Sequence, residues 1–133
     1  MTFHLSQRSS LNLTGVHPDL VKVVMRALEI SPLDFTVIEG IRTVKRQQEL
    51  FASGASKTMK SRHIHGFAVD VAPLVAGSIR WDWPLYDRLI VAFKQAAKDV
   101  KVKVEFGYDW KTFKDAPHLQ LPHVAYPDPV KDA

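Results

Sequence analysis

Six consecutive residues near the middle of the chain, FAVDVA at 67–72, alternate in the way that is typical of a β-strand. Large apolar residues occupy positions 67, 69 and 71, while alanine, aspartate and alanine occupy positions 68, 70 and 72. Successive side chains of a strand point to opposite faces, so one face of this strand would belong to the core. The other face would present Asp70 between two small neighbours, which leaves room beside the carboxylate. The stretch therefore predicts a strand with one buried face and one face suited to a site.

Helical spacing, turn residues and β-branched runs predict the other elements. Pro18 suits the first turn of a helix, and Thr43 can cap a second helix whose Leu50 and Phe51 would face the core. The expected helices are 18–29, 43–53 and 84–100, and the expected strands are 35–39, 67–72 (closed by Pro73), 103–106 and 117–121. This order, without regular βαβ units, predicts an α+β fold in which about three helices flank a small, mainly antiparallel sheet.

Composition and length limit the class of protein further. The 133 residues, 46% of them hydrophobic and 24% charged, are enough for one globular domain with a buried core. We expect a single domain over residues 1–133, with residues 122–133 as a loose, proline-rich tail. The longest apolar run, Leu89 to Phe93, is far too short to cross a membrane, and the N-terminal residues do not resemble a secretory signal.

The residue types in the chain limit how it could bind a metal ion or a charged partner. There is no cysteine, so a metal would have to be held by His, Asp or Glu. The net charge of +4 suits an anionic partner such as a bacterial wall polymer, although ordinary solubility charge explains it equally well. Net charge is also the sole support for nucleic-acid binding, which we do not expect.

Two segments that are distant in the chain can bring metal ligands together. In PHLQL at 117–121, His118 and Gln120 would share one face of a short strand. If this strand pairs with 67–72, and Gly66 bends the chain, then His63, Asp70 and His118 converge on one ion. Two imidazoles and one carboxylate, with an open position, suit a catalytic zinc ion, although Co²⁺ or Mn²⁺ could use the same ligands. His65 is an alternative ligand, because periodicity does not fix its direction next to Gly66.

Two further residues are candidates for catalysis. Asp115 lies three residues before His118, in DAPH, where Pro117 favours an extended chain that would carry the carboxylate alongside the metal. There it could act as a general base, but a structural role in a turn is the alternative. Arg42, in EGIRT after a buried strand, could bind a substrate carboxylate or an anionic intermediate. Gln47 and Gln48 could add hydrogen bonds, although an exposed helix face explains them as well.

Three motifs together resemble a known family. SRHIHGFAVD fits the pattern Ser-x-His-x-x-Gly-x-Ala-x-Asp, DAPH fits Asp-x-x-His, and EGIRT is followed by glutamine. Together they resemble the zinc D-alanyl-D-alanine peptidases and L-alanyl-D-glutamate endopeptidases, which share the Hedgehog/DD-peptidase fold. The resemblance extends over nearly the whole chain, from GVHPDL at 15–20 to FGYDWKTFKDAPHLQL at 106–121, and is strongest to single-domain endolysins of tailed bacteriophages.

The resemblance implies a role for each matching residue. His63, Asp70 and His118 would be the zinc ligands, Asp115 the general base, and Arg42 a catalytic residue that binds and polarises the substrate. Ser61 would support the site and, like Gln47, contribute to substrate binding.

The implied function is that of a zinc endolysin. Such an enzyme would hydrolyse the peptidoglycan stem peptide between L-Ala and D-Glu, with a zinc-activated water and an aspartate base. A D-Ala-D-Ala carboxypeptidase or dipeptidase of the same fold, and a non-catalytic, zinc-held wall-binding module, are the alternatives. We expect a monomer without stable membrane association that stays in the host cytoplasm until lysis and then acts on the cell wall.

Overall fold

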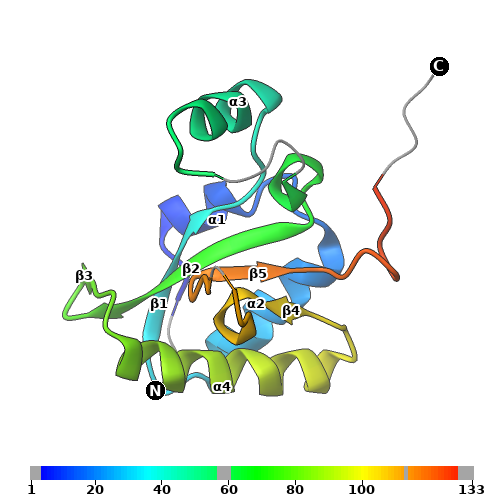
Figure 1. Cartoon of the computed structure of the whole chain (residues 1–133). Coiled ribbons are helices and arrows are strands. Elements are labelled where there is room, and N and C mark those ends of the chain that lie inside the picture. The colour runs from blue at the N-terminus through cyan, green and yellow to red at the C-terminus, as the bar shows by residue number, and fades with distance from the viewer. Residues whose placement is uncertain (1–3, 57–60, 113, 129–133) are drawn as a thin grey trace.

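The computed structural model describes residues 4–56, 61–112 and 114–128. This part of the chain forms four α-helices, two short 3-10 helices and five strands (Figure 1). The helices are α1 (Gln7–Asn12), α2 (Pro18–Ile30), α3 (Val44–Ala52), η1 (Arg62–His65), α4 (Trp83–Val100) and η2 (Gly107–Asp109). The strands are β1 (Asp34–Glu39), β2 (Ala68–Val75), β3 (Ser78–Ile79), β4 (Glu105–Phe106) and β5 (His118–Gln120).

The strands form one antiparallel sheet whose centre is β2. Its order is β1-β2-β5-β4, and β3 pairs with the far end of β2. The pairing of β2 with β5 places Asp70 directly opposite His118. The α+β class with a small antiparallel sheet is therefore confirmed, and so is the pairing of the two segments that carry the candidate ligands.

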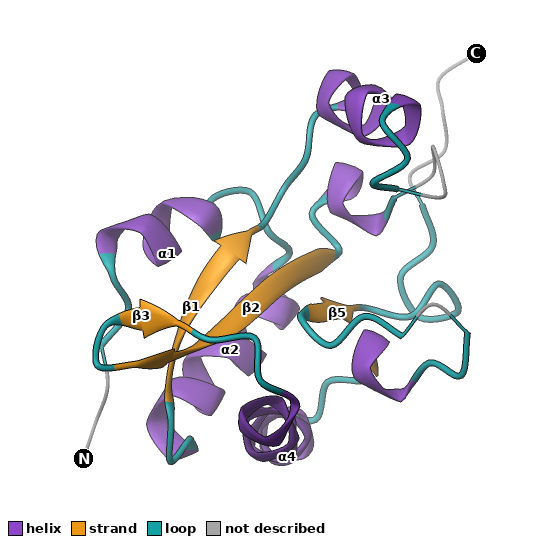
Figure 2. Cartoon of the chain, turned by 60° about the vertical axis from the view of Figure 1, so that its left-hand side comes forward, coloured by secondary structure: helices purple, strands orange, loops and turns teal. Residues whose placement is uncertain are grey.

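One face of this sheet forms the hydrophobic core with α2 and α4 (Figure 2). Val69 and Val71 of β2 and Leu119 of β5 are completely buried in it. The Phe35 and Phe93 rings meet edge to face with centroids 5.1 Å apart, an arrangement that adds to the stability gained by burial. The alternation in FAVDVA thus directs the valines into the core and Asp70 to the opposite face, as the sequence predicts.

A fourth helix, α1, was not expected from the sequence. It packs on β1 through polar contacts: Ser9 Oγ is 3.0 Å from Thr36 Oγ1 and accepts a 2.9 Å bond from the Val37 amide. Asn12 Nδ2 donates to the Val37 carbonyl at 2.8 Å. Because these contacts are hydrogen bonds between polar side chains and a strand, α1 lacks the apolar periodicity that identifies α2 and α4.

Two further predictions about the elements were wrong. Pro73 does not close β2, which continues to Val75, since the Pro73 carbonyl still accepts a 3.0 Å bond from the Arg80 amide across the β2–β3 hairpin. Phe51 is 48% exposed instead of facing the core. The reason is that α3 projects beyond the sheet (Figures 1 and 2), and Gln47 is the only residue of this helix that is buried.

The described part of the tail, residues 122–128, contacts the rest of the chain through Arg62 and Asp19. The buried guanidinium of Arg62 pairs with Asp128 at 2.8 Å and donates to the carbonyls of Leu121 and Tyr126. The Tyr126 hydroxyl donates to Asp19 at 2.7 Å. The division of the chain into one domain and a loose tail stays a prediction.

Candidate metal centre

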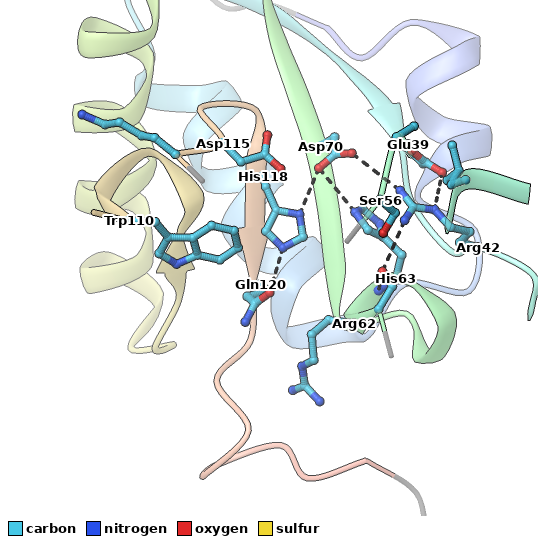
Figure 3. Close-up of a pocket in the computed structure, with 14 residues that line it drawn as sticks. Glu39, Arg42, Ser56, Arg62, His63, Asp70, Trp110, Asp115, His118 and Gln120 are labelled. Atoms are coloured by element: carbon cyan, nitrogen blue, oxygen red, sulfur yellow. Dashed lines mark hydrogen bonds and ion pairs between the residues drawn. The ribbon is translucent and has the colours of Figure 1, made fainter. Parts of the chain in front are cut away.

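The face of the sheet opposite the core carries a cluster of three potential metal ligands. His63, Asp70 and His118 each offer a ligand atom, and these atoms lie within 4.8 Å of one another. Asp70 Oδ1 is 3.1 Å from His118 Nδ1 and 3.3 Å from His63 Nε2, as Figure 3 shows. The three residues that the sequence singled out as ligands are therefore brought together from η1, β2 and β5.

The turn before β2 directs His63 back toward Asp70. Ser61 caps η1 by accepting a 3.2 Å bond from the His63 amide, and Gly66 ends this helix with φ +77°. A Cβ at Gly66 would lie 2.4 Å from the Gly15 carbonyl oxygen, so a larger residue has no room there. The bend that the sequence predicted at Gly66 is thus a left-handed turn that only glycine adopts readily.

Hydrogen bonds orient both imidazoles so that one nitrogen of each ring remains for a metal. His63 Nδ1 lies 2.8 Å from the Gly40 carbonyl and donates to it. His63 Nε2 is left buried with no hydrogen-bond partner among the described residues. His118 Nε2 lies 2.8 Å from Gln120 Oε1, which leaves His118 Nδ1 facing Asp70. Such outer hydrogen bonds are the usual way in which proteins fix the tautomer of a metal-binding histidine.

The charges within the cluster stabilise an ionised Asp70. Burial alone would raise the pKa of the Asp70 carboxyl, but the hydrogen bond to His118 and the nearby imidazole of His63 hold it well below its usual range. Burial alone would lower the pKa of His118, whereas the hydrogen bond and charge of Asp70 raise it. A carboxylate between two imidazoles, one of which has a buried nitrogen with no hydrogen-bond partner in the described part of the chain, is a donor set that fits a divalent metal such as zinc.

Arg42 lies beside the cluster and is held by several side chains. Arg42 Nε donates to Glu39 Oε1 at 2.7 Å, and Nη1 donates to Gln47 Oε1 at 2.7 Å. Arg42 Nη1 also reaches Ser61 Oγ at 3.3 Å, while Nη2 is 4.0 Å from Asp70 Oδ2. The side chain is 10% exposed and lines the pocket. Sequence reasoning missed Glu39, because its position at the end of a strand gave no sign of the ion pair.

Gln47 does not lie on an exposed helix face. It is completely buried, and its Nε2 donates to Ser56 Oγ at 2.8 Å while its Oε1 accepts from Arg42. It therefore links α3 and the following loop to Arg42. Substrate binding by Gln47 and Ser61 stays a prediction, and the contacts of both residues favour a role in positioning Arg42 and His63.

Asp115 lies in the turn that leads into β5, at the edge of the same pocket. Its amide donates to the Gly107 carbonyl at 2.9 Å, and its carbonyl accepts from the His118 amide at 3.1 Å. A Cβ at Gly107 would come within 2.3 Å of the Asp115 carbonyl oxygen, so the turn depends on glycine there. Loss of hydration, followed by the negative charge of Asp70, raises the pKa of the Asp115 carboxyl above its ordinary value.

The pocket around these groups has a volume of about 670 Å³. Trp110, whose ring centroid is 5.3 Å from that of His118, lines the pocket on the side opposite Glu39 and Arg42 (Figure 3). Lys114 and Leu50 also line it. Sequence reasoning did not identify Trp110 or Lys114, since the loop that carries them has no periodic pattern. His65, the alternative ligand, is exposed, lies against Phe67 and is outside the cluster.

The sequence of the chain matches one family model and is similar to two named proteins. Residues 1–122 match the model of a family described as phage L-alanyl-D-glutamate peptidase. The L-alanyl-D-glutamate peptidase of Escherichia phage T5 is 42% identical over 119 residues, which cover 86% of this chain and 87% of that protein. The peptidoglycan L-alanyl-D-glutamate endopeptidase CwlK of Bacillus subtilis is 34% identical over 126 residues, which cover 81% and 74% of the two proteins.

A solved structure is also similar over almost the whole chain. The L-Ala D-Glu endopeptidase ChiX of Serratia marcescens superposes with a TM-score of 0.88 at 46% identity, covering 96% of this chain and 94% of that one. Sequence and fold agree on the same group of proteins, and the chain belongs to the family of phage L-alanyl-D-glutamate peptidases.

Proposed function

We propose that this protein is a zinc-dependent endopeptidase that hydrolyses the bond between L-Ala and D-Glu in the stem peptide of peptidoglycan. Its family and the names of its relatives support the bond, and the name of the Bacillus subtilis relative supports peptidoglycan as the substrate. The observation that carries the proposal is the convergence of His63, Asp70 and His118, with the buried Nε2 of His63 lacking a hydrogen-bond partner among the described residues.

The three converging residues would hold the metal ion. When bound, a zinc ion would supply Lewis-acid chemistry, which polarises a carbonyl oxygen and makes water acidic near neutral pH. Zinc is favoured by two imidazoles and one carboxylate, and Co²⁺ or Mn²⁺ are the alternatives. Gly40 and Gln120 would keep the two rings in the binding tautomer by accepting the protons of the other ring nitrogens.

Asp115 would move the proton during hydrolysis. One carboxylate oxygen would take a proton from the attacking water, and the carboxyl group would then deliver it to the amine of D-Glu as the peptide bond breaks. The turn through Gly107 supports this role, since it holds Asp115 by backbone hydrogen bonds at the rim of the pocket that contains the cluster.

Arg42 would stabilise the negative charge that develops on the L-Ala carbonyl oxygen. Its contacts with Glu39, Gln47 and Ser61 fix the guanidinium before substrate arrives, and fixed donors of this kind are effective because they need no reorganisation during the reaction. Arg42 Nη2 lies 4.0 Å from Asp70 Oδ2, beside the cluster.

We infer that the protein acts as an endolysin. It would remain in the host cytoplasm until lysis and would then reach the cell wall as a monomer. No helix among the described residues is long and apolar enough to cross a membrane. The positive net charge of +4 supports attraction to an anionic wall polymer.

The decisive experiment is mass spectrometry of purified peptidoglycan after digestion by the zinc-loaded protein. We expect new amino termini on D-Glu and glycan fragments that retain L-Ala. Release of D-Ala would instead favour the D-Ala-D-Ala carboxypeptidase, and wall binding without new termini would favour a binding module. Asp115→Asn should retain zinc and lose about 10²–10⁴-fold in rate, the range typical of general bases. An unchanged rate in this variant would remove Asp115 from the mechanism.

A further inference from the structure

The side chain of Arg62 connects the two segments that carry the histidines of the cluster. Arg62 directly precedes His63 in η1. Its Nε and Nη2 both donate to the Leu121 carbonyl, at 3.2 and 2.8 Å, and Leu121 directly follows β5, which begins at His118. The guanidinium is buried and points away from the cluster (Figure 3). One side chain therefore joins the turn that carries His63 to the end of the strand that carries His118.

Contacts between Arg62 and Phe67 close the turn that contains His63. The Arg62 carbonyl accepts a 3.0 Å bond from the Phe67 amide, and the guanidinium carbon lies 4.4 Å from the centroid of the Phe67 ring. A cation in this position is attracted by the face of the ring. The Phe67 carbonyl in turn accepts a 2.9 Å bond from the Leu121 amide. The closed turn is thus bonded to the end of β5 through both of its flanking residues.

The tail supplies the remaining partners of the guanidinium. Arg62 Nη1 lies 2.8 Å from Asp128 Oδ1 and 3.4 Å from His123 Nδ1, and Nη2 donates to the Tyr126 carbonyl at 2.7 Å. With the two bonds to Leu121, these contacts match the five N–H groups of a guanidinium. A buried cation that loses its anionic partner is strongly destabilising. The position of Arg62 therefore depends on the carboxylate of Asp128.

The distance between the two histidine-bearing segments matters for metal binding. The rings of His63 and His118 have centroids 5.1 Å apart, and they come from segments that are far apart in the chain. An ion binds the molecules in which both rings already lie together, so its apparent dissociation constant rises as the fraction of such molecules falls. The hydrogen bonds of the Arg62 side chain join these two segments and so would raise this fraction.

We propose that Arg62 is a positioning residue, and that its contacts with residues 121–128 hold the two histidine-bearing segments in the arrangement that binds the metal ion. This inference rests on the proposed function, since it assumes that His63 and His118 are metal ligands. It also gives the tail a role, because Asp128 neutralises the guanidinium. Lysine is not an equivalent residue here, since an ammonium has three donors and no planar fork.

The test is the zinc dissociation constant of the full chain, measured by competition with a chelator. Arg62→Lys keeps the charge but loses the planar fork, and Asp128→Ala removes the counter-ion. Each should raise the dissociation constant about tenfold, at the low end of the range for residues that support metal ligands. Asp82→Ala, which removes an exposed ion pair with Arg80, is the matched control and should bind zinc as wild type does.

Activity gives a second readout that separates positioning from catalysis. The digestion of peptidoglycan by Arg62→Lys and Asp128→Ala should be slow at limiting zinc and should recover as free zinc is raised, because both substitutions leave the proposed ligands and catalytic residues in place. A rate that stays low in the zinc-saturated variants would contradict a role in positioning the ligands.

Phe93→Ala separates positioning from a general loss of stability. This substitution removes a completely buried ring from the core and should destabilise the fold while leaving the zinc dissociation constant unchanged. If it raised the dissociation constant as much as Arg62→Lys does, weaker zinc binding would be a general consequence of lower stability, and the inference would be overturned.

The remaining outcomes distinguish this inference from the proposed function. An unchanged dissociation constant in either variant of Arg62 or Asp128 overturns the inference while the function stands, and if one of the two does not fold, the other decides. A wild-type protein that binds zinc but does not cleave purified wall at L-Ala–D-Glu removes the proposed function, and the zinc measurements still decide the role of Arg62. A wild-type protein that binds no zinc overturns both.

Discussion

The two faces of the central sheet are built from alternate residues of the same strands, but different interactions stabilise them. On the core face, Val69, Val71 and Leu119 are completely buried among apolar side chains of α2 and α4. On the pocket face, Asp70 and His118 are held by hydrogen bonds and charge. Burial of apolar groups is non-directional, whereas a metal site depends on the direction of each nitrogen and oxygen. Substitutions on the two faces should therefore have separable effects.

The largest effect is expected from a change on the pocket face. His63→Gln removes the buried nitrogen that lacks a partner among the described residues, so zinc affinity should fall more than the 10–100-fold typical of outer-shell changes, and activity should fall with it. Zinc content after dialysis and the rate of peptidoglycan digestion measure both effects. His65→Gln, two residues away and exposed, is the matched control and should keep its zinc. If His65→Gln lost its zinc and His63→Gln kept it, the ligand would be His65 and not His63.

A change on the core face should reduce stability and spare the site. Phe93→Ala removes a completely buried ring and its contact with Phe35, and should lower the free energy of unfolding by about 3–5 kcal/mol. Urea unfolding measures this change, and zinc content measured well below the unfolding midpoint should match wild type. Val91→Ala, on the exposed side of the same helix, should change stability by less than about 0.5 kcal/mol. A folded Phe93→Ala protein without zinc would show that the two faces are not separable.

The smallest of these effects is expected from a change at Glu39, whose charge positions Arg42 beside the cluster. Glu39→Gln weakens the charged hydrogen bond that fixes Arg42, and should lower kcat/KM about tenfold with zinc content unchanged. Glu49→Gln, which alters an exposed ion pair with Arg46 on α3, should leave kcat/KM unchanged. Equal effects of the two substitutions would mean that Glu39 acts through overall charge and not through Arg42.

The parts of the molecule that the sequence predicted are those determined by local patterns. The period-two alternation of β2 identified its two faces, and the spacing after Pro18 identified α2, because each signal is contained within one element. The three candidate ligands could also be predicted from the sequence, since a glycine bend and an antiparallel pairing were enough to bring them together.

The parts that the sequence did not predict depend on contacts between distant segments. The helix α1 docks through Ser9 and Asn12, so its residues show no apolar face. Because α3 projects beyond the sheet, Gln47 is its buried residue and Phe51 is exposed. Helical periodicity alone would have assigned the apolar residue to the buried face. The pairing of Glu39 with Arg42, and the contacts of Arg62 with residues 121–128, arise from the packing of separate segments and have no local signature.

The central claim, that His63, Asp70 and His118 hold one metal ion, is tested most directly by X-ray absorption at the zinc edge of the zinc-loaded protein. We expect one zinc per chain, with a first shell of two imidazole nitrogens and oxygen ligands at about 2.0–2.2 Å. His63→Gln should reduce the imidazole contribution and the zinc content together. A wild-type protein that binds no zinc, or a zinc shell without imidazole, would contradict the claim.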